Sequence, residues 1–342
     1  MNLLLAGDFS PDEQAAWLHA LRHALPAHCV LSPHDPRASG MPIDAAIVAN
    51  PAPGSLAGLP GLRLIQSLWA GVDRLLADPT LPPGVPIARM VDPAMNAAMA
   101  ETALWATLAL QRGFFNYARQ QAQGLWQSHA QRRADEMTVL VLGHGELGRA
   151  VALRLAQQGY PVSAWRRAPS GQGAAGSAAG ASGSAADAEA AVADASAARS
   201  TQVQVRVLSG LAALAGAMAS AQVVINLLPL TPQTRGLINA EWLARLPRGA
   251  GLVNLARGAQ VVDDDLLAAL DAGQLGHAVL DVFHTEPLPA NHRFWTHPKV
   301  TVLPHTAAQT DARSAAAVVA RNIEALASGA PLQHLVQRAA GY

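Results

Sequence analysis

The 342-residue sequence lacks several features that mark whole classes of protein. Its single cysteine, Cys29, excludes an intrachain disulfide and fits a reducing compartment. The 24 basic residues equal the 24 acidic residues, which leaves no basic surface for nucleic acid or anionic lipid. No apolar run reaches transmembrane length. At the start of the chain, MNLLLAGDF, the apolar run is too short for a signal peptide and no basic segment precedes it. We therefore expect a cytoplasmic protein without nucleic-acid or membrane partners.

A glycine-rich turn in the middle of the chain predicts a dinucleotide site. In MTVLVLGHGELGRAVALRLAQQGYPVSAW, Gly143, Gly145 and Gly148 have the G-x-G-x-x-G spacing between an apolar strand and a helix. The first glycine permits the tight turn, the second lets backbone approach a pyrophosphate, and the third lets helix pack on strand. The amides around Glu146 and Leu147, at the helix N-terminus, are expected to meet the phosphates. Glycines also end strands for structural reasons, but the strand–helix–strand context favours a nucleotide.

The residues after the second strand of this unit decide which dinucleotide is expected. An NAD-binding chain usually places Asp or Glu there, to bind the ribose 2′-hydroxyl. Here the strand ends in Arg166 and Arg167, which could face a 2′-phosphate, so we expect NADPH, with NADH as the alternative cofactor. The competing interpretation is that both arginines are solvated surface residues. From about Ala168 to Ser200 the chain is rich in Ala, Gly and Ser, which is typical of a flexible linker. One interpretation is that this segment lies beside the site of the 2′-phosphate. The other is that it is an insertion without function, which a surface loop tolerates at little cost in stability.

The alternation of apolar strands and helical stretches predicts an α/β fold of two Rossmann/flavodoxin-like domains, with an active-site cleft between them. Residues 1–94 contain the strands MNLLLAG, DAAIVAN and LRLIQSL and the helix PDEQAAWLHALRHAL. A long helical pattern from about Met95 to Gln127 leads into the NAD(P)-binding domain, residues 95–304. The helix DARSAAAVVARNIEALASG is expected to return to the first domain, so that residues 1–94 and 305–342 form one discontinuous substrate-binding domain. Strands of the second domain are expected near Val139, Val162, Val205, Val224, Leu252, Val279 and Val302.

Three residues far apart in sequence carry the sharpest chemistry, and each follows the predicted end of a strand. They are Arg257 in LVNLARGAQVV, Glu286 in AVLDVFHTEPLP and His305 in VTVLPHTAAQT. Arg supplies an anion-binding fork, His a proton near neutral pH, and Glu a partner that favours the charged His. This set suits the reduction of a 2-oxo acid. Taken singly, Arg257 could instead form an interdomain salt bridge, and His305 could be a capping residue after Pro304.

Other polar clusters have simpler explanations than chemistry. His284, Glu286, His292 and His297 crowd one loop, but their spacing fits no helix-based ligand pair, so we expect no metal. The acidic run from Asp263 to Asp265 immediately precedes LLAALDAG, where helix caps and charges that match the helix dipole belong.

An aromatic and aliphatic face lies on the long helical pattern. Trp105, Leu108, Leu110 and Phe114 are expected to be core or dimer contacts, and we expect a homodimer. Glu101, on the same pattern, could support the site or be purely structural.

The chain resembles the D-isomer-specific 2-hydroxyacid dehydrogenases, and within them the glyoxylate/hydroxypyruvate reductase branch. The resemblance covers nearly the whole chain through LWAGVDRLL, GHGELGRAVALRL, VVINLLPLTPQTRGLIN, LPRGAGLVNLARGAQVVDDDLLAALDAGQL, AVLDVFHTEPLP and HPKVTVLPHTAA. It implies that Arg257 binds substrate, that His305 donates the proton and that Glu286 supports His305. Backbone amides of Ala70 and Gly71, in the AGVD turn, would bind the substrate carboxylate. Trp69 departs from the glycine of many relatives, and its larger side chain would narrow the substrate mouth.

The resemblance also implies cofactor contacts. Asp281 matches the residue that holds the nicotinamide carboxamide, with the backbone near Ala256 beside it, while Leu228 and Pro229 would line the ribose side. The implied reaction is reduction of a small 2-oxo acid, and the sequence does not rank glyoxylate, hydroxypyruvate and phenylpyruvate. The alternative is a dinucleotide-sensing binding protein without catalysis, which would have no need of a proton donor. Oxidation of NADPH on addition of glyoxylate discriminates between the two.

Overall fold

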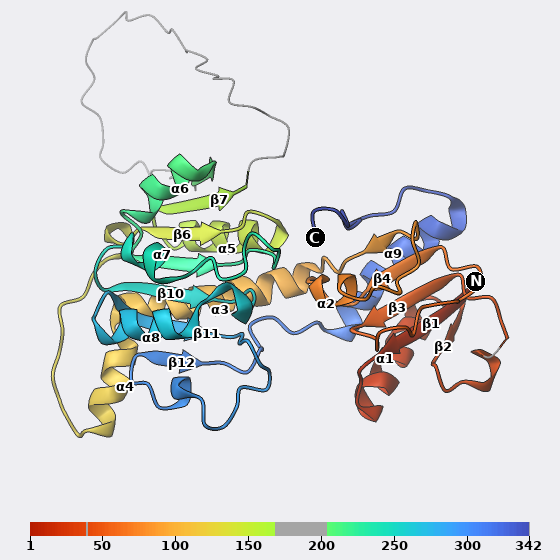
Figure 1. The fold of residues 1–342 in the computed structure, drawn as a ribbon, viewed down its shortest axis with the longest axis horizontal. Coiled ribbons are helices and arrows are strands. Elements are labelled where there is room, and N and C mark those ends of the chain that lie inside the picture. Colours follow the sequence, from red (N-terminus) through yellow and green to blue (C-terminus); the bar gives the residue numbers. More distant parts are fainter. Residues whose placement is uncertain (39, 168–203, 342) are drawn as a thin grey trace, which may run out of the picture.

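The computed structural model describes residues 1–38, 40–167 and 204–341. Figure 1 shows two α/β units side by side, each built round a parallel sheet, which confirms the predicted α/β fold class. The predicted insert at about 168–200 lies outside the described residues. The domain limits at residues 94/95 and 304/305 stay a prediction.

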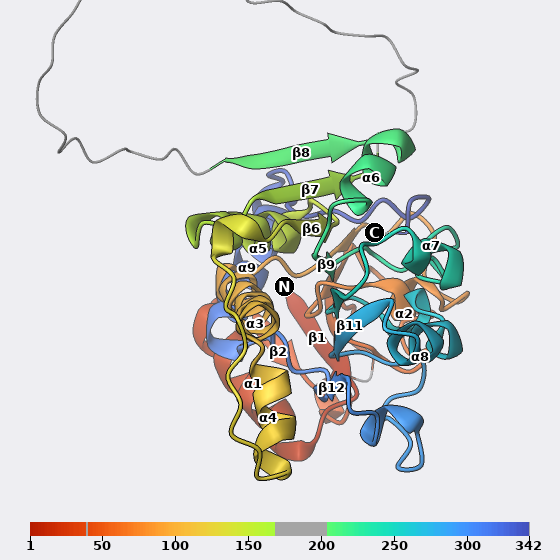
Figure 2. The same ribbon diagram turned by 90° about the vertical axis from the view of Figure 1, so that its left-hand side faces the viewer.

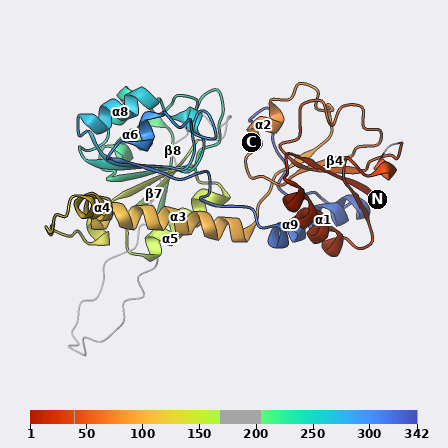
Figure 3. The ribbon, with the colours of Figure 1, turned by 90° about the horizontal axis from the view of Figure 1, so that it is seen from below.

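The N-terminal unit contains a five-stranded sheet in the order β2-β1-β3-β4-β5, with every pair parallel. This is the flavodoxin-like strand order. Its strands are β1 (Asn2–Gly7), β2 (Cys29–Leu31), β3 (Ala45–Ala49), β4 (Leu64–Ser67) and β5 (Ile87–Ala88). Helix α1 (Pro11–Ala24) packs beside α9 (Ala312–Ser328), so the C-terminal helix does return to this unit. Figure 3 shows the two helices together under the sheet. Helix α2 (Asp73–Leu76) and the 3-10 helix η1 (Pro36–Ala38) complete this unit.

The second unit contains a seven-stranded parallel sheet in the order β12-β11-β10-β9-β6-β7-β8, and Figure 2 shows β8 at one edge. The order reverses between β6 and β9, as in Rossmann folds. Its strands are β6 (Val139–Leu142), β7 (Val162–Arg166), β8 (Val205–Ser209), β9 (Val223–Asn226), β10 (Ala250–Asn254), β11 (Leu275–Leu280) and β12 (Val300–Val302). Its other elements are α5 (Glu146–Gln157), α6 (Leu211–Met218), α7 (Ala240–Ala244), α8 (Asp263–Asp271), η2 (Ala134–Glu136), η3 (Gly258–Gln260) and η4 (Arg293–Trp295).

Alternation along the strands divides the core of this sheet between its two faces. In β6, Val139 and Val141 pack with α5 and the preceding long helix, whereas Leu140 and Leu142 pack with α6, α7 and α8. A strand buried on both faces reads as a continuous apolar run, as VLVL does here. Helices therefore cover both faces of the sheet, and a ligand can reach it only at the ends of the strands.

The long helix predicted from Met95 to Gln127 is in fact two helices. Helix α3 (Pro93–Arg112) ends at Gly113, which has a left-handed backbone with φ of 68°, and α4 (Phe114–Ala122) follows. Glycine adopts this conformation without the penalty of a Cβ atom, so the break has a local cause. Residues 125–133 then run without regular structure to η2.

The acidic run at the start of α8 is not its side-chain cap. Val262 is the N-cap residue, without a side-chain bond, and Asp263, Asp264 and Asp265 form the first helical turn. The expectation of a side-chain cap was therefore wrong. The expectation of negative charge that matches the helix dipole agrees with the structure. In the described part of the chain, no helix is both long and apolar enough to cross a membrane.

Candidate active site

Four loops that carry reactive groups leave the same edge of the seven-stranded sheet. All its strands are parallel, so their carboxyl ends lie together. The glycine turn follows β6, Arg257 follows β10, Glu286 follows β11 and His305 follows β12. The reversal of strand order between β6 and β9 lies at this edge, and ligands of open α/β sheets bind at such a point.

His305 and Glu286 form a direct pair. The Nδ1 atom of His305 lies 2.7 Å from Oε2 of Glu286, and the backbone N–H of Phe283 donates to the other carboxylate oxygen at 2.8 Å. The bond to Glu286 raises the pKa of His305 above its ordinary value. Burial alone raises the pKa of Glu286, but the bonds from His305 and Phe283 outweigh it and the pKa is lowered. The side chain of His305 remains 53% exposed, so its far nitrogen is accessible.

Asp281 fixes the backbone that carries His305. Its carbonyl accepts from the His305 N–H at 2.9 Å, and its carboxylate accepts from the N–H groups of Thr306 at 2.7 Å and Ala307 at 3.0 Å. His305 has a left-handed backbone with φ of 53°, which non-glycine residues adopt only when their surroundings hold them there. Burial raises the pKa of Asp281, although the two amide bonds oppose that shift. Sequence reasoning gave Asp281 a cofactor contact and missed this support of the His305 loop.

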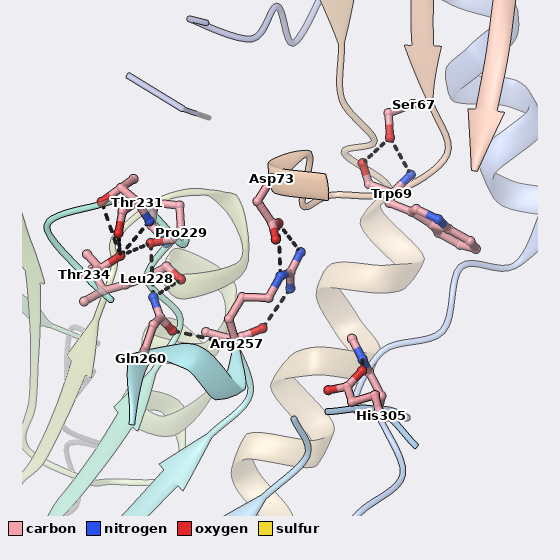
Figure 4. Close-up of polar contacts among 12 residues, drawn as sticks. Ser67, Trp69, Asp73, Leu228, Pro229, Thr231, Thr234, Arg257, Gln260 and His305 are labelled. Carbon is pink, nitrogen blue, oxygen red and sulfur yellow. Dashed lines mark hydrogen bonds and ion pairs between the residues drawn. The ribbon is translucent and has the colours of Figure 1, made fainter. Parts of the chain in front are cut away.

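Arg257 makes its strongest contacts with Asp73 of the N-terminal unit. Its Nε and Nη2 atoms donate to Oδ1 of Asp73 at 3.0 and 2.9 Å, and its Nη1 donates to the carbonyl of Ala256 at 2.7 Å. Figure 4 shows the guanidinium turned toward Asp73. The salt bridge between units, which the sequence left open as an alternative, is therefore present. Arg257 makes no hydrogen bond to Glu286 or His305, but its positive charge lowers the pKa of both.

A buried polar network lies under Arg257. The Gln260 Oε1 atom accepts from Asn226 Nδ2 at 2.7 Å and from the Arg257 N–H at 3.2 Å. Its Nε2 donates to the carbonyls of Leu228 at 3.0 Å and Pro229 at 3.1 Å, as Figure 4 shows. All the hydrogen-bonding capacity of this amide, two donors and two acceptors, is thus used. Gln260 joins the loop expected at the cofactor ribose to the loop of Arg257, and sequence reasoning did not single it out.

The turn from Trp69 to Gly71 lies against Arg257. Ser67 Oγ holds both backbone polar groups of Trp69, and the Trp69 side chain packs against the core of the N-terminal unit. A Cβ atom on Gly71 would lie 1.6 Å from Nη2 of Arg257, so only glycine allows this approach. Within the described residues, the N–H groups of Ala70 and Gly71 have no protein acceptor. They are free to bind an anion.

The glycine turn has the shape that a diphosphate needs. A Cβ atom on Gly148 would lie 1.8 Å from the carbonyl oxygen of Gly143, so the third glycine is required by packing. Gly143 has a positive φ of 100°. A Cβ atom on Gly145 would meet nothing within 4 Å, and Gly145 caps α5 without any side-chain bond. The helix therefore starts at Glu146 without a side-chain cap, and its first backbone N–H groups could donate to a phosphate.

Arg166 and Arg167 are both exposed after β7. Burial, followed by the positive charges of Arg166 and Arg149, lowers the pKa of His144 in the glycine turn. The end of β7 lies against this turn, because the Gly143 N–H donates to the Trp165 carbonyl at 2.8 Å. Within the described residues, neither Arg166 nor Arg167 forms an ion pair.

The histidines of the loop after β11 pair with acidic side chains. His284 Nε2 lies 3.6 Å and His292 Nε2 lies 3.5 Å from the carboxylate of Asp263, while His297 Nε2 lies 3.1 Å from Asp271. In the described ranges, no group of three such side chains has the geometry to hold a metal ion.

Comparison with known proteins places this geometry in a family. Residues 104–175 and 170–307 match the profile of the D-isomer specific 2-hydroxyacid dehydrogenase NAD binding domain. A glyoxylate/hydroxypyruvate reductase A from Serratia proteamaculans is 38% identical, with all of both chains covered.

Solved structures agree with the sequence comparison. A D-isomer specific 2-hydroxyacid dehydrogenase from Xanthobacter autotrophicus, in complex with NADPH and MES, has a TM-score of 0.84 and 36% identity, with 99% of both chains covered. An NADPH-dependent glyoxylate/hydroxypyruvate reductase from Sinorhizobium meliloti, in complex with NADP and sulfate, has a TM-score of 0.83 and 32% identity, with 100% of this chain and 99% of the other covered.

Proposed function

Because this chain belongs to the D-isomer-specific 2-hydroxyacid dehydrogenase family, we propose that it reduces small 2-oxo acids with NADPH as the preferred cofactor. The proposed substrates are glyoxylate and hydroxypyruvate, which would give glycolate and D-glycerate. The observation that carries the proposal is the His305–Glu286 pair, at the same sheet edge as Arg257 and the glycine turn. The names of the similar reductases and the NADPH and NADP bound to related structures support it.

Binding of the substrate carboxylate follows from the free donors near Arg257. The N–H groups of Ala70 and Gly71 would donate to the substrate carboxylate, while Arg257 would contact the carboxylate or the carbonyl oxygen. Trp69 would border the substrate. Two anchors fix the orientation of the bond between C1 and C2, and orientation contributes to rate by removing rotational freedom before the reaction.

The cofactor would be held by residues that the structure leaves accessible. The N–H groups of the turn from Gly143 to Gly148 fit the diphosphate, and Arg166 and Arg167 fit the 2′-phosphate. Leu228, Pro229, Ala256 and Asp281 would surround the nicotinamide riboside. When bound, NADPH supplies the hydride that reduces C2 of the substrate.

His305 would supply the proton. As C2 is reduced, the carbonyl oxygen gains negative charge, and Nε2 of His305 donates a proton to it, which gives the hydroxyl group and a neutral imidazole. Glu286 bonds to the other nitrogen, fixes the ring and favours the protonated form before the reaction. Asp281 keeps the His305 backbone in place.

We also propose a homodimer formed through α4 and the segment after it. Trp126 is fully exposed, and Phe114 and Leu125 are about half exposed, so this segment presents apolar side chains to water. Trp105 is also partly exposed, whereas Leu108 and Leu110 pack against the core. A second copy of the chain would cover the exposed group.

The free thiol of Cys29 supports a cytoplasmic location.

A screen of small 2-oxo acids with NADPH and NADH tests the proposed function. We expect oxidation of NADPH that depends on added glyoxylate or hydroxypyruvate. A protein that binds NADPH but oxidises it with none of these acids would instead be a dinucleotide-sensing protein.

A further inference from the structure

Asp73 lies three residues beyond Ala70, on the other unit from Arg257, and makes the only ion pair of Arg257 among the described residues. The two side chains are 21% and 30% exposed, so water only partly screens their attraction. One carboxylate oxygen, Oδ1, accepts from both Nε and Nη2. This contact engages the edge of the guanidinium nearest its stem.

The remaining hydrogen-bond donors of Arg257 identify what this contact does. A guanidinium has five N–H groups. Asp73 takes two of them and the carbonyl of Ala256 takes a third, which leaves one on Nη1 and one on Nη2 without a partner in the described part of the chain. These two N–H groups lie on the two end nitrogens, here called the terminal edge, and such a pair can meet the two oxygens of a carboxylate.

We propose that Asp73 is a positioning residue that holds Arg257 with its terminal edge free for the substrate carboxylate. The inference rests on the proposed reductase function. Without Asp73, the guanidinium could turn about its long stem, and binding of the substrate would have to order it. Gly71, whose backbone touches Nη2, belongs to the same turn, so Asp73 also holds the carboxylate-binding amides against Arg257.

The opposite possibility is that Asp73 merely competes with substrate for Arg257. In that case, removal of its charge frees the fork and tightens substrate binding. Positioning predicts weaker binding and slower turnover instead. The two interpretations therefore differ in the sign of one measured effect.

Asp73→Asn keeps the shape of the side chain and removes its charge. We expect kcat/KM for glyoxylate to fall about tenfold or more, because a hydrogen bond to a charged partner is stronger than one to a neutral partner. The KM for NADPH should stay unchanged. Asp73→Ala, as a second variant, should lose at least as much. Asp44→Asn is the matched control, because Asp44 also pairs with an arginine of the N-terminal unit, Arg63, at 3.3 Å.

A double-mutant cycle separates positioning from general damage to the fold. In an Arg257→Ala background, Asp73→Asn should change kcat/KM less than about twofold, because the partner that it positions is gone. An unchanged or increased kcat/KM in the single variant, or an equal loss in both backgrounds, would overturn the proposal. If the unmodified protein reduces no 2-oxo acid, the proposed function itself fails. If the unmodified protein is active and Asp73→Asn leaves its kcat/KM unchanged, only this inference fails.

Discussion

His305 Nδ1 and Glu286 Oε2 are 2.7 Å apart, although the two residues are 19 positions apart along the chain. The bond leaves Nε2 of His305 as the nitrogen that can meet a substrate. It also raises the pKa of His305 from an ordinary value of 6.5. A larger fraction of the enzyme therefore carries the proton at neutral pH, which is the form that reduction requires.

Glu286→Gln should move the pH dependence of reduction. Reduction needs protonated His305, so kcat/KM is highest at low pH and falls as pH rises through the pKa of that histidine. Loss of the carboxylate removes the main cause of the raised pKa, and the fall should begin at lower pH. The measurement is kcat/KM for glyoxylate against pH. Asp271→Asn, which removes the partner of His297, is the control and should leave the profile unchanged. Identical profiles for Glu286→Gln and the unmodified protein would refute the role of Glu286.

Arg257→Lys should raise KM for the 2-oxo acid and lower kcat together. Lys keeps the charge but loses the planar fork that reaches Asp73, Ala256 and substrate at once. Steady-state kinetics with varied glyoxylate measures both constants. Arg63→Lys, at a surface pair, should have no effect. An unchanged kcat/KM in Arg257→Lys would remove the substrate role.

Replacement of both Arg166 and Arg167 by Gln should weaken NADPH binding selectively. Hydrogen bonds to charged groups contribute about 1.5 to 3 kcal/mol each, which corresponds to roughly tenfold or more in Kd. The loss should shrink at high salt, since exposed charges are screened. Titrations of NADPH and NADH measure it, with Arg245→Gln as a control for an exposed arginine elsewhere. Equal affinities for NADH and NADPH in the unmodified protein would contradict the assignment and leave the catalytic residues untouched.

Replacement of Leu125 and Trp126 by Ser should shift the protein from dimer to monomer. The two side chains are exposed on a segment without regular structure, and burial of apolar area is what would hold a dimer together. Light scattering at several concentrations gives the mass. Leu211→Ser, an exposed apolar residue on α6, should leave the mass unchanged. A monomeric unmodified protein would refute the dimer.

The strand ends and the glycine turn could be predicted because their signals are local. Apolar runs such as VLVL end at a glycine or a polar residue, which marks the end of each strand. In a parallel sheet, all carboxyl ends of the strands lie at one edge, so the residues that follow them are expected to lie together. The break at Gly113 was also readable, since a glycine after an apolar helical stretch is a common helix end, yet the helical pattern on both sides hid it.

The partners of the site residues could not be predicted. Asp73 and Arg257 are 184 residues apart and lie on different units, so their pairing depends on how the units pack. Gln260 sits in an ordinary run, RGAQVV, and its side-chain partners come from residues 226–229 and from Arg257, which only the fold brings together. Asp281 was noticed, but its bonds to Thr306 and Ala307 follow from the register of β11 against β12.

Single-turnover reduction of glyoxylate by His305→Gln, with bound NADPH in excess of the acid, tests the central claim most directly. Removal of a general acid should lower the rate of NADPH oxidation by about 10² to 10⁴, while the Kd for NADPH stays within about twofold of the unmodified protein. That result assigns proton donation to His305 and leaves cofactor binding intact. A near-normal rate at neutral pH would contradict the account, because reduction would then proceed without the His305–Glu286 pair.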